Sequence, residues 1–297
     1  MNKREFLKAG VGLGIGMGVA ACSGAGGGNN AESEAAARDA ARIERESRKA
    51  PPVPNRKLKT TRLFKSPQGY PNAIAASPEG LWIGEQRTDE GVGVSNDAFL
   101  VDWKTGKELR HVKTESRNTS GMGYGDGHLW MGANAPPQGI FKTNLDGKTV
   151  AHRQIPLGPA DNGGGCHGVE YREGKLWINA LRMKGILRVD ANTFEPEFMI
   201  PYTFERTHAT AWDNGAIWLV TGSLNGPSID DDSASLAKFD AATGKLLETA
   251  SFDQAEVDPH GICFHDGVLY GCDASIHPRW PDGRSPSAGY IFRIDFV

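Results

Sequence analysis

The amino-acid sequence predicts an all-β fold, a β-propeller, and three observations lead to it. The first is a hairpin pattern at 259–270, PHGICFHDGVLY, with an apolar strand, an Asp-Gly turn and a second strand ending on an aromatic residue. The second is that four similar hairpins precede it and end on Trp82, Trp130, Trp177 and Trp218. The third is the spacing of these aromatic positions, which recur every 41 to 52 residues, as propeller blades do.

A second hairpin pattern follows the first in each of the first four repeats, so four strands are expected per blade. The last repeat ends with a single strand pattern at 289–295 and lacks the partner for it. The segment Leu58–Phe64, near the start of the domain, has the pattern of the missing strand. We therefore expect five four-stranded blades, closed by the N-terminal strand pairing with the last blade, which protects sheet edges that would otherwise be exposed.

The N-terminal residues indicate export rather than structure. Residues 1–22 carry a run, NKREFLK, that resembles a twin-arginine export motif with Lys for the first Arg, and end in a lipoprotein-like cleavage box at Cys22. A Sec signal with an incidental cysteine is the alternative. Residues 23–56 are expected to be a flexible tether and 57–297 the propeller domain. We expect a lipid anchor at Cys22, on the periplasmic side of a bacterial membrane.

The near balance of acidic and basic residues limits the classes of binding partner that we expect. The chain has 33 Lys and Arg against 36 Asp and Glu, a net charge of −3. This favours neither nucleic acid nor an anionic membrane surface as a partner. We expect a monomer that binds a small-molecule substrate.

One position of the repeat is polar in all five copies. His167, His208 and His260 lie seven residues before the turn glycine, as does Ser120, and Asn72 lies one residue further out, which we interpret as a longer turn. The first strand of each propeller blade lines the central channel, so these five residues, the ring positions, are expected to surround one mouth of it.

Three imidazoles at equivalent positions favour a divalent metal site. Neutral histidine is a common ligand of zinc, copper and iron, and a metal-bound water can act as a nucleophile or base near neutral pH. We expect His167, His208 and His260 to bind the ion, with zinc, iron, calcium and magnesium left open. The structural alternative is that these imidazoles only hydrogen-bond backbone groups at the start of each blade.

The second strand of each hairpin ends near the same mouth. A two-residue turn would pair Asp273 directly with His260, and without a metal this pair would form an oriented general base. Glu85 ends the second strand of the first repeat and could shuttle a proton. We expect His260, Asp273 and Glu85 to be catalytic. The residues expected to contact substrate are Asn72, Ser120, Asn179 and Arg279.

The cysteines of the domain and one aspartate run each allow two interpretations. Cys166, beside His167, is a soft ligand or a small buried residue, and Cys263 and Cys272 are a disulfide or two free thiols. Asp230–Asp232 is a calcium site or a solvated loop.

The repeat units PHGI with LY at 259–270 and PNAI with LWIG at 71–84 resemble the repeat of the virginiamycin B lyase family, and more widely gluconolactonase-like and NHL-type propellers. The resemblance implies a metal at the channel mouth. Those lyases open an ester-linked ring by elimination, with His and Glu near the metal, and the gluconolactonase relatives hydrolyse lactones. Peptide-amidating lyase propellers place three histidines on a zinc, which resembles the three ring histidines here. The chain departs from these families in its five repeats, where they have six or seven blades, and in Asn72 and Ser120.

We therefore expect an exported, metal-dependent lyase or hydrolase that acts on a lactone, ester or glycoside at the channel mouth. The alternative is a non-catalytic periplasmic binding or scaffold lipoprotein that uses the same face. A fold does not choose between them, because function depends on the site.

Overall fold

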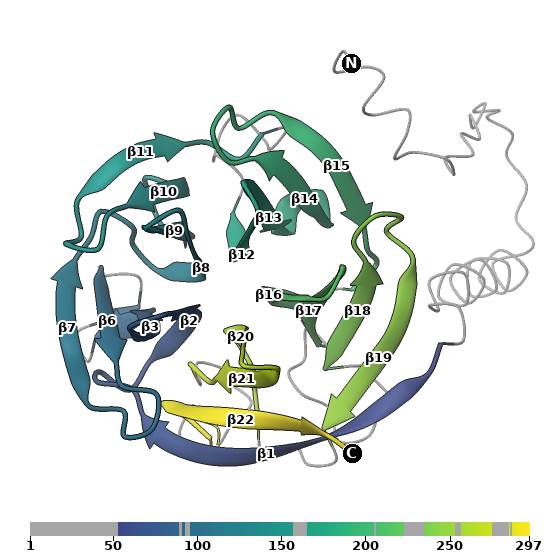
Figure 1. Ribbon diagram of the computed structural model, residues 1–297, viewed down its shortest axis with the longest axis horizontal. Helices are drawn as coiled ribbons and strands as arrows, with labels where there is room; N and C mark the ends of the chain where they lie inside the picture. Colours follow the sequence, from purple (N-terminus) through teal and green to yellow (C-terminus); the bar gives the residue numbers. More distant parts are fainter. Residues whose placement is uncertain are drawn as a thin grey trace, which may run out of the picture. The chain divides into compact units, whose positions relative to one another are not determined.

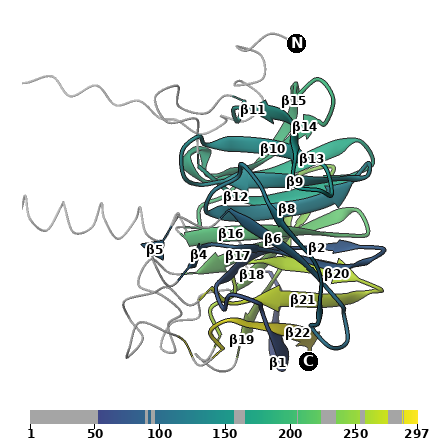
Figure 2. The ribbon, with the colours of Figure 1, turned by 90° about the vertical axis from the view of Figure 1, so that its left-hand side faces the viewer.

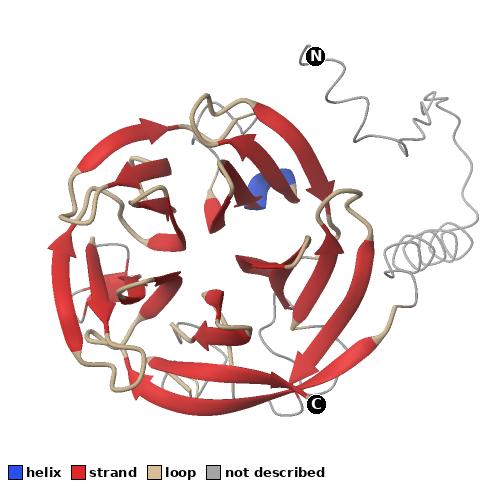
Figure 3. Cartoon of the chain, viewed as in Figure 1, coloured by secondary structure: helices blue, strands red, loops and turns tan. Residues whose placement is uncertain are grey.

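The structure is a computed structural model that describes residues 53–88, 91–92, 96–156, 165–204, 206–222, 235–252, 257–274, 285 and 287–297. Residues 54–297 form one compact unit. The regular elements described in it are strands, apart from the short 3-10 turn η1 (Leu181–Met183), so the predicted all-β class is confirmed (Figure 3). Among the described residues, no helix has the length and apolar character that a membrane span requires.

Three sheets contain four antiparallel strands each. The first has the order β2 (Pro71–Ser77), β3 (Gly80–Glu85), β6 (Asp97–Val101) and β7 (Glu108–Lys113). The second has the order β8 (Thr119–Gly125), β9 (His128–Ala133), β10 (Gly139–Thr143) and β11 (Thr149–Arg153). The third has the order β12 (Cys166–Arg172), β13 (Lys175–Ala180), β14 (Gly185–Asp190) and β15 (Pro196–Pro201).

A larger sheet holds the remaining long strands. Its first half is β16 (Arg206–Asp213), β17 (Ala216–Gly222), β18 (Leu236–Asp240) and β19 (Leu246–Phe252). Its second half is β1 (Asn55–Lys65), β22 (Tyr290–Phe296), β21 (Val268–Cys272) and β20 (Ile262–His265). The halves join where β19 and β1 pair in parallel, whereas the other pairs in this sheet are antiparallel.

These sheets are arranged around a common centre, as in a β-propeller (Figure 1). The strands β2, β8, β12, β16 and β20, which we call the inner strands, lie nearest to it, and each contacts the next, with β20 contacting β2. A small pair formed by β4 (Arg87–Thr88) and β5 (Gly91–Val92) lies at one end of the sheets (Figure 2). The predicted repeat therefore folds as a ring of similar sheets.

The turns of the inner hairpins follow from their sequences. In four of them both turn residues have positive φ, as at Asp126 (54°) and Gly127 (67°), which suits the twist of a two-residue hairpin. In the first hairpin Ser77 pairs with Gly80, so the turn Pro78–Glu79 also has two residues. The longer turn expected there is wrong, because the glycine follows the turn rather than lying in it.

The tryptophans that mark the repeat belong to the core. Trp82, Trp130, Trp177 and Trp218 are all buried. A cation from the neighbouring strand lies over three of these rings, with Lys238 Nζ 5.3 Å from the centre of Trp218. Such contacts cover the edge of the core while keeping the charge in water.

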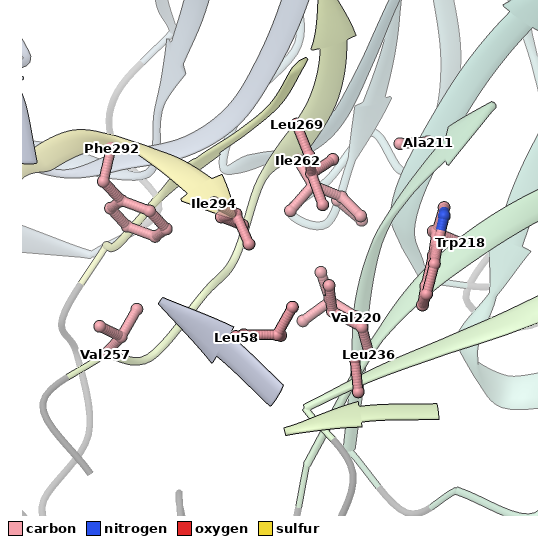
Figure 4. Close-up of a cluster of buried hydrophobic side chains, with 12 residues drawn as sticks. Leu58, Ala211, Trp218, Val220, Leu236, Val257, Ile262, Leu269, Phe292 and Ile294 are labelled. Carbon is pink, nitrogen blue, oxygen red and sulfur yellow. The ribbon is translucent and has the colours of Figure 1, made fainter. Parts of the chain in front are cut away.

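Strand β1 connects the two halves of the large sheet. Residues 55–58 pair with β19, and residues 58–65 pair with β22, the strand for which the sequence lacks a following partner. Leu58, at the change of partner, is 1% exposed and packs among Val220, Leu236, Phe292 and their neighbours (Figure 4). Its burial removes apolar surface of both halves from water.

We expect Leu58→Ala to lower the free energy of unfolding by about 2–5 kcal/mol, because it leaves a cavity where β1 meets both halves of the large sheet. Leu63→Ala, in the same strand but 42% exposed, is the matched control and should cost less than about 1 kcal/mol. Urea unfolding of the three proteins measures both values. Equal costs for the two variants would contradict this role of β1.

Candidate functional site

The five ring positions share one backbone feature, a β-bulge. The pairing register shifts by one residue between Pro71 and Ala73, and likewise across Ser120, His167 and His208 in the next three inner hairpins. At His260, both this residue and Gly261 hydrogen-bond to Cys272, which gives the same extra residue. A bulge re-aims a side chain and ends regular pairing, so it sets each ring side chain apart from the ladder below it.

Two ring side chains bond to the next sheet in the ring. Asn72 Nδ2 donates to the Thr119 carbonyl (3.0 Å) and to Ser120 Oγ (2.9 Å). His167 Nδ1 faces the Thr207 carbonyl at 3.0 Å, so it carries the proton and donates it. In both cases the acceptor is the residue before the next ring position. The structural alternative, an imidazole that hydrogen-bonds a backbone group, therefore describes His167, and the Asn72 amide makes a similar contact.

The three ring histidines lie side by side. The ring centres of His167 and His208 are 4.9 Å apart at 13° between planes, and those of His208 and His260 are 4.3 Å apart at 54°. His260 Nδ1 faces the Asp258 carbonyl at 2.9 Å and so donates to it. The two outer imidazoles are thus fixed in the tautomer protonated at Nδ1.

His208, the middle imidazole, differs from its neighbours. Within the part of the chain that the structure describes, neither of its ring nitrogens has a hydrogen-bond partner, and the residue is half-buried. Burial, followed by the charges of His260, Arg206 and His167, lowers its pKa well below the usual 6.5. It is therefore an uncharged imidazole with an open lone pair at neutral pH.

The outer histidines are also uncharged at neutral pH. Burial lowers the pKa of His167, and it lowers the pKa of His260 to about 4 against the opposing charge of Asp258. Protonating any one of the three imidazoles would place a charge in a site already close to the Arg206 guanidinium. Protonation is therefore unfavourable at each of the three imidazoles.

The fit of a metal ion to these residues is mixed. Metal-binding histidines commonly donate their other N–H to a carbonyl, as His167 and His260 do. However, their Nε2 lone pairs face N–H donors, Asn134 Nδ2 at 2.9 Å and Arg206 Nη2 at 3.5 Å. Among the described residues, no group of three His, Cys, Asp or Glu is placed to hold a metal ion. As arranged, the histidines do not fit a three-histidine centre, and the metal stays a prediction.

Asp273 does not pair with His260, so the expected direct pairing is wrong. The bulge at His260 and Gly261 shifts the register by one residue, and the Asp273 carboxylate instead accepts the Asp258 N–H (3.0 Å) and the hydroxyls of Ser285 (2.5 Å) and Ser287. Burial, with the nearby Asp258 charge, raises the pKa of Asp273 to about 6. In this position it fixes the segment that leads into β20.

Glu85 has the same arrangement in the first sheet. Its carboxylate accepts the backbone N–H groups of Tyr70 (2.8 Å) and Gln68 (3.3 Å), which precede β2. The side chain is fully buried, and burial raises its pKa to about 7. Glu85 and Asp273 thus each anchor the chain that precedes an inner strand. Their predicted catalytic roles stay predictions.

Three of the four predicted substrate contacts, Asn72, Ser120 and Asn179, lie in the same ring of hydrogen bonds. Asn179 Nδ2 donates to the His208 carbonyl (2.6 Å), and its Oδ1 accepts the Tyr202 hydroxyl (2.6 Å). Ser120 Oγ donates to the Asn118 carbonyl at 3.1 Å. Asn72, Ser120 and Asn179 are all buried, so these contacts hold neighbouring sheets together. Their contact with substrate stays a prediction.

The sequence reasoning missed an ion pair beside the histidines. Arg206 Nη1 and Nη2 donate to the two Asp258 carboxylate oxygens at 2.6 and 2.9 Å, and Asp258 is buried. A signal was present, because Arg206 and Asp258 each lie two residues before a ring histidine, His208 and His260. Opposite charges at one repeat position in consecutive repeats predict a contact between neighbours.

Some sequence candidates lie outside the described residues, namely Cys22, Arg279 and Asp230–Asp232. The three described cysteines, Cys166, Cys263 and Cys272, are free and buried, so the disulfide interpretation is wrong. Burial raises the pKa of the Cys166 thiol to about 12, which makes it a poor ligand or nucleophile at neutral pH.

Comparison with solved structures shows the fold. Glutaminyl cyclase from Myxococcus xanthus is similar with a TM-score of 0.57 at 11% identity, over 83% of this chain and all of that one. Virginiamycin B lyase from Staphylococcus aureus matches with a TM-score of 0.46 at 19% identity, over 79% of this chain and 69% of that one. No family model matches the sequence, and no curated protein matches it. At 11% identity, the similarity to glutaminyl cyclase is one of fold alone.

Glu85→Gln should remove part of the pH dependence of stability. The pKa of Glu85 is about 7 in the folded protein against 4.5 ordinarily, so below pH 4.5 both states hold the proton and the stabilisation is complete. It declines as pH rises to about 7, where the folded protein must also lose the proton. Between pH 4.5 and 8 this accounts for at most about 3 kcal/mol of the free energy of unfolding.

Urea unfolding at pH 5 and pH 8 measures the effect. The wild-type protein should lose more stability over this range than Glu85→Gln does. Glu79→Gln, at an exposed position in the turn of the same hairpin, is the control and should behave like the wild type. Parallel pH profiles for the wild type and Glu85→Gln would contradict a buried, protonated Glu85.

Proposed function

We propose that the protein is an enzyme that performs acid–base chemistry on a small molecule, with His208 as the proton acceptor. The observation that carries the proposal is the state of this imidazole, which is half-buried, uncharged at neutral pH and free of hydrogen-bond partners within the described residues. An imidazole that needs neither to lose a proton nor to break a bond can accept one from substrate.

The neighbours of His208 support this role. His167 and His260 are held by backbone carbonyls and pack against either side of it, so its ring has a defined position. Its lowered pKa makes the protonated form a strong acid, which returns the proton readily to a leaving group. Elimination and hydrolysis of a lactone or an ester both need this pair of transfers, so a lyase or a hydrolase is the proposed class.

The proposal includes the architecture predicted from the repeat. We propose that the three four-stranded sheets and the two halves of the large sheet are five blades, and that β1 closes the ring by completing the last blade. The pairing of β1 with both β19 and β22 supports this count. Export and a lipid anchor at Cys22 are also proposed, on the sequence alone, and membrane fractionation of the full chain tests them.

We expect His208→Gln to lower kcat on a lactone or ester that the wild type turns over by at least about 100-fold, the usual loss when a general base is removed. His128→Gln, beside the Asp126–Gly127 turn of the second inner hairpin, is the matched control and should leave kcat unchanged. A panel of lactones and 4-nitrophenyl esters serves as the screen. The wild-type rate should be flat near pH 7 and fall only well below pH 6.5, where His208 gains a proton.

Three results would contradict the proposal. One is equal activity of the wild type and His208→Gln. Another is a wild-type protein that turns over no member of the panel, which would favour the binding or scaffold alternative. The third is one tightly held metal per chain that is lost in His208→Gln, because His208 would then be a ligand and the predicted metal centre would replace the free base.

A further inference from the structure

Arg206 adds a second functional group beside the proposed base. It begins β16, two residues before His208, and its guanidinium contacts both Asp258 and the imidazole of His260. Its side chain is 13% exposed, whereas that of Asp258 is 1% exposed. The Asp258 carboxylate is thus enclosed behind the Arg206 guanidinium, and the guanidinium keeps some contact with solvent.

The hydrogen-bonding capacity of Arg206 is only partly used. A guanidinium has five N–H donors, and the contacts to Asp258 and His260 engage three of them at most. The contact to His260 is long, at 3.5 Å. The Nε–H and the Nη2–H that makes the long contact to His260 share one edge of the rigid guanidinium, and a carboxylate that replaces the His260 contact matches this edge. Arg206 can therefore hold Asp258 and still bind a second anionic group.

The positive charge of Arg206 acts on all three ring histidines. Its guanidinium lowers the pKa of His167, His208 and His260, whereas Asp258 opposes it only at His260. Pairing with Asp258 therefore does not cancel the positive charge at His167 and His208. An anionic oxygen placed beside His208 would meet an uncharged imidazole and a cation.

We propose that Arg206 is the anion-binding group of this site and that the substrate carries a carboxylate. The carboxylate binds the open edge of the Arg206 guanidinium while His208 reaches the proton to be transferred. Arg206 is a specificity-determining residue in this arrangement, and Asp258 positions it. The inference rests on the proposed function for the role of His208, but the anion-binding site itself does not.

The test uses two probes of similar shape, benzoate and benzamide, with isothermal titration calorimetry at pH 7.5 and low salt. The wild-type protein should bind benzoate at least about tenfold more tightly than benzamide. Arg206→Gln should lose that preference, and Arg206→Lys, which keeps the charge without the fork, should retain part of it. Arg188→Gln is the control, because Arg188 lies in β14 against Trp177 and Glu197 and should not change binding.

Equal binding of the two probes by the wild type, or no binding of either, would overturn the proposal. So would an undiminished preference in Arg206→Gln. Thermal unfolding verifies that each variant folds, and if Arg206→Gln does not, a preference as large in Arg206→Lys as in the wild type overturns the role of the fork. His208→Gln should still prefer benzoate, so loss of activity with retained binding separates failure of the base from failure of the anion site.

Discussion

The structure depends on how closely the inner strands approach one another. A Cβ atom at Gly121 would lie 2.6 Å from the backbone of Gly168, one at Gly168 would lie 2.8 Å from the Thr210 nitrogen, and one at Gly261 would lie 3.0 Å from the Ile74 nitrogen. Atoms cannot pack at such distances, so the residue after each ring position is glycine or alanine in all five repeats. Because larger side chains cannot fit between these strands, the polar group of each repeat lies on the bulge just before the point of contact.

One repeat position consequently serves two purposes. Asn72 and His167 use it to bond the residue before the next ring position, and Asn179 and Asn134 add further bonds between neighbouring sheets. His208 occupies the same position without such a bond, although its neighbours hold it in place. A side chain that the ring does not need for its own stability is available for chemistry. The nearby Arg206–Asp258 pair adds a cation where the histidines stay uncharged.

The strands and the ring positions could be predicted from the sequence, because two-residue turns and apolar alternation have local causes. Leu58–Phe64 and 289–295 were recognised as strands for this reason. The place of Asp273 could not be predicted, since a bulge at His260 depends on the contact of Gly261 with a neighbouring strand. The hydrogen bonds of the histidines depend in the same way on carbonyls of other segments. The Arg206–Asp258 contact could have been predicted from the sequence, because the two residues share one repeat position.

The protonation states of the ring histidines test most directly whether this cluster is an uncharged acid–base site. Nitrogen-15 NMR of the imidazoles in the full chain, assigned with single His→Gln variants, measures them. We expect His167 and His260 to carry their proton on Nδ1 at pH 7, and His208 to be neutral and to titrate well below pH 6.5. A protonated His208 at pH 7, or ring nitrogens shifted by a bound metal, would contradict this arrangement.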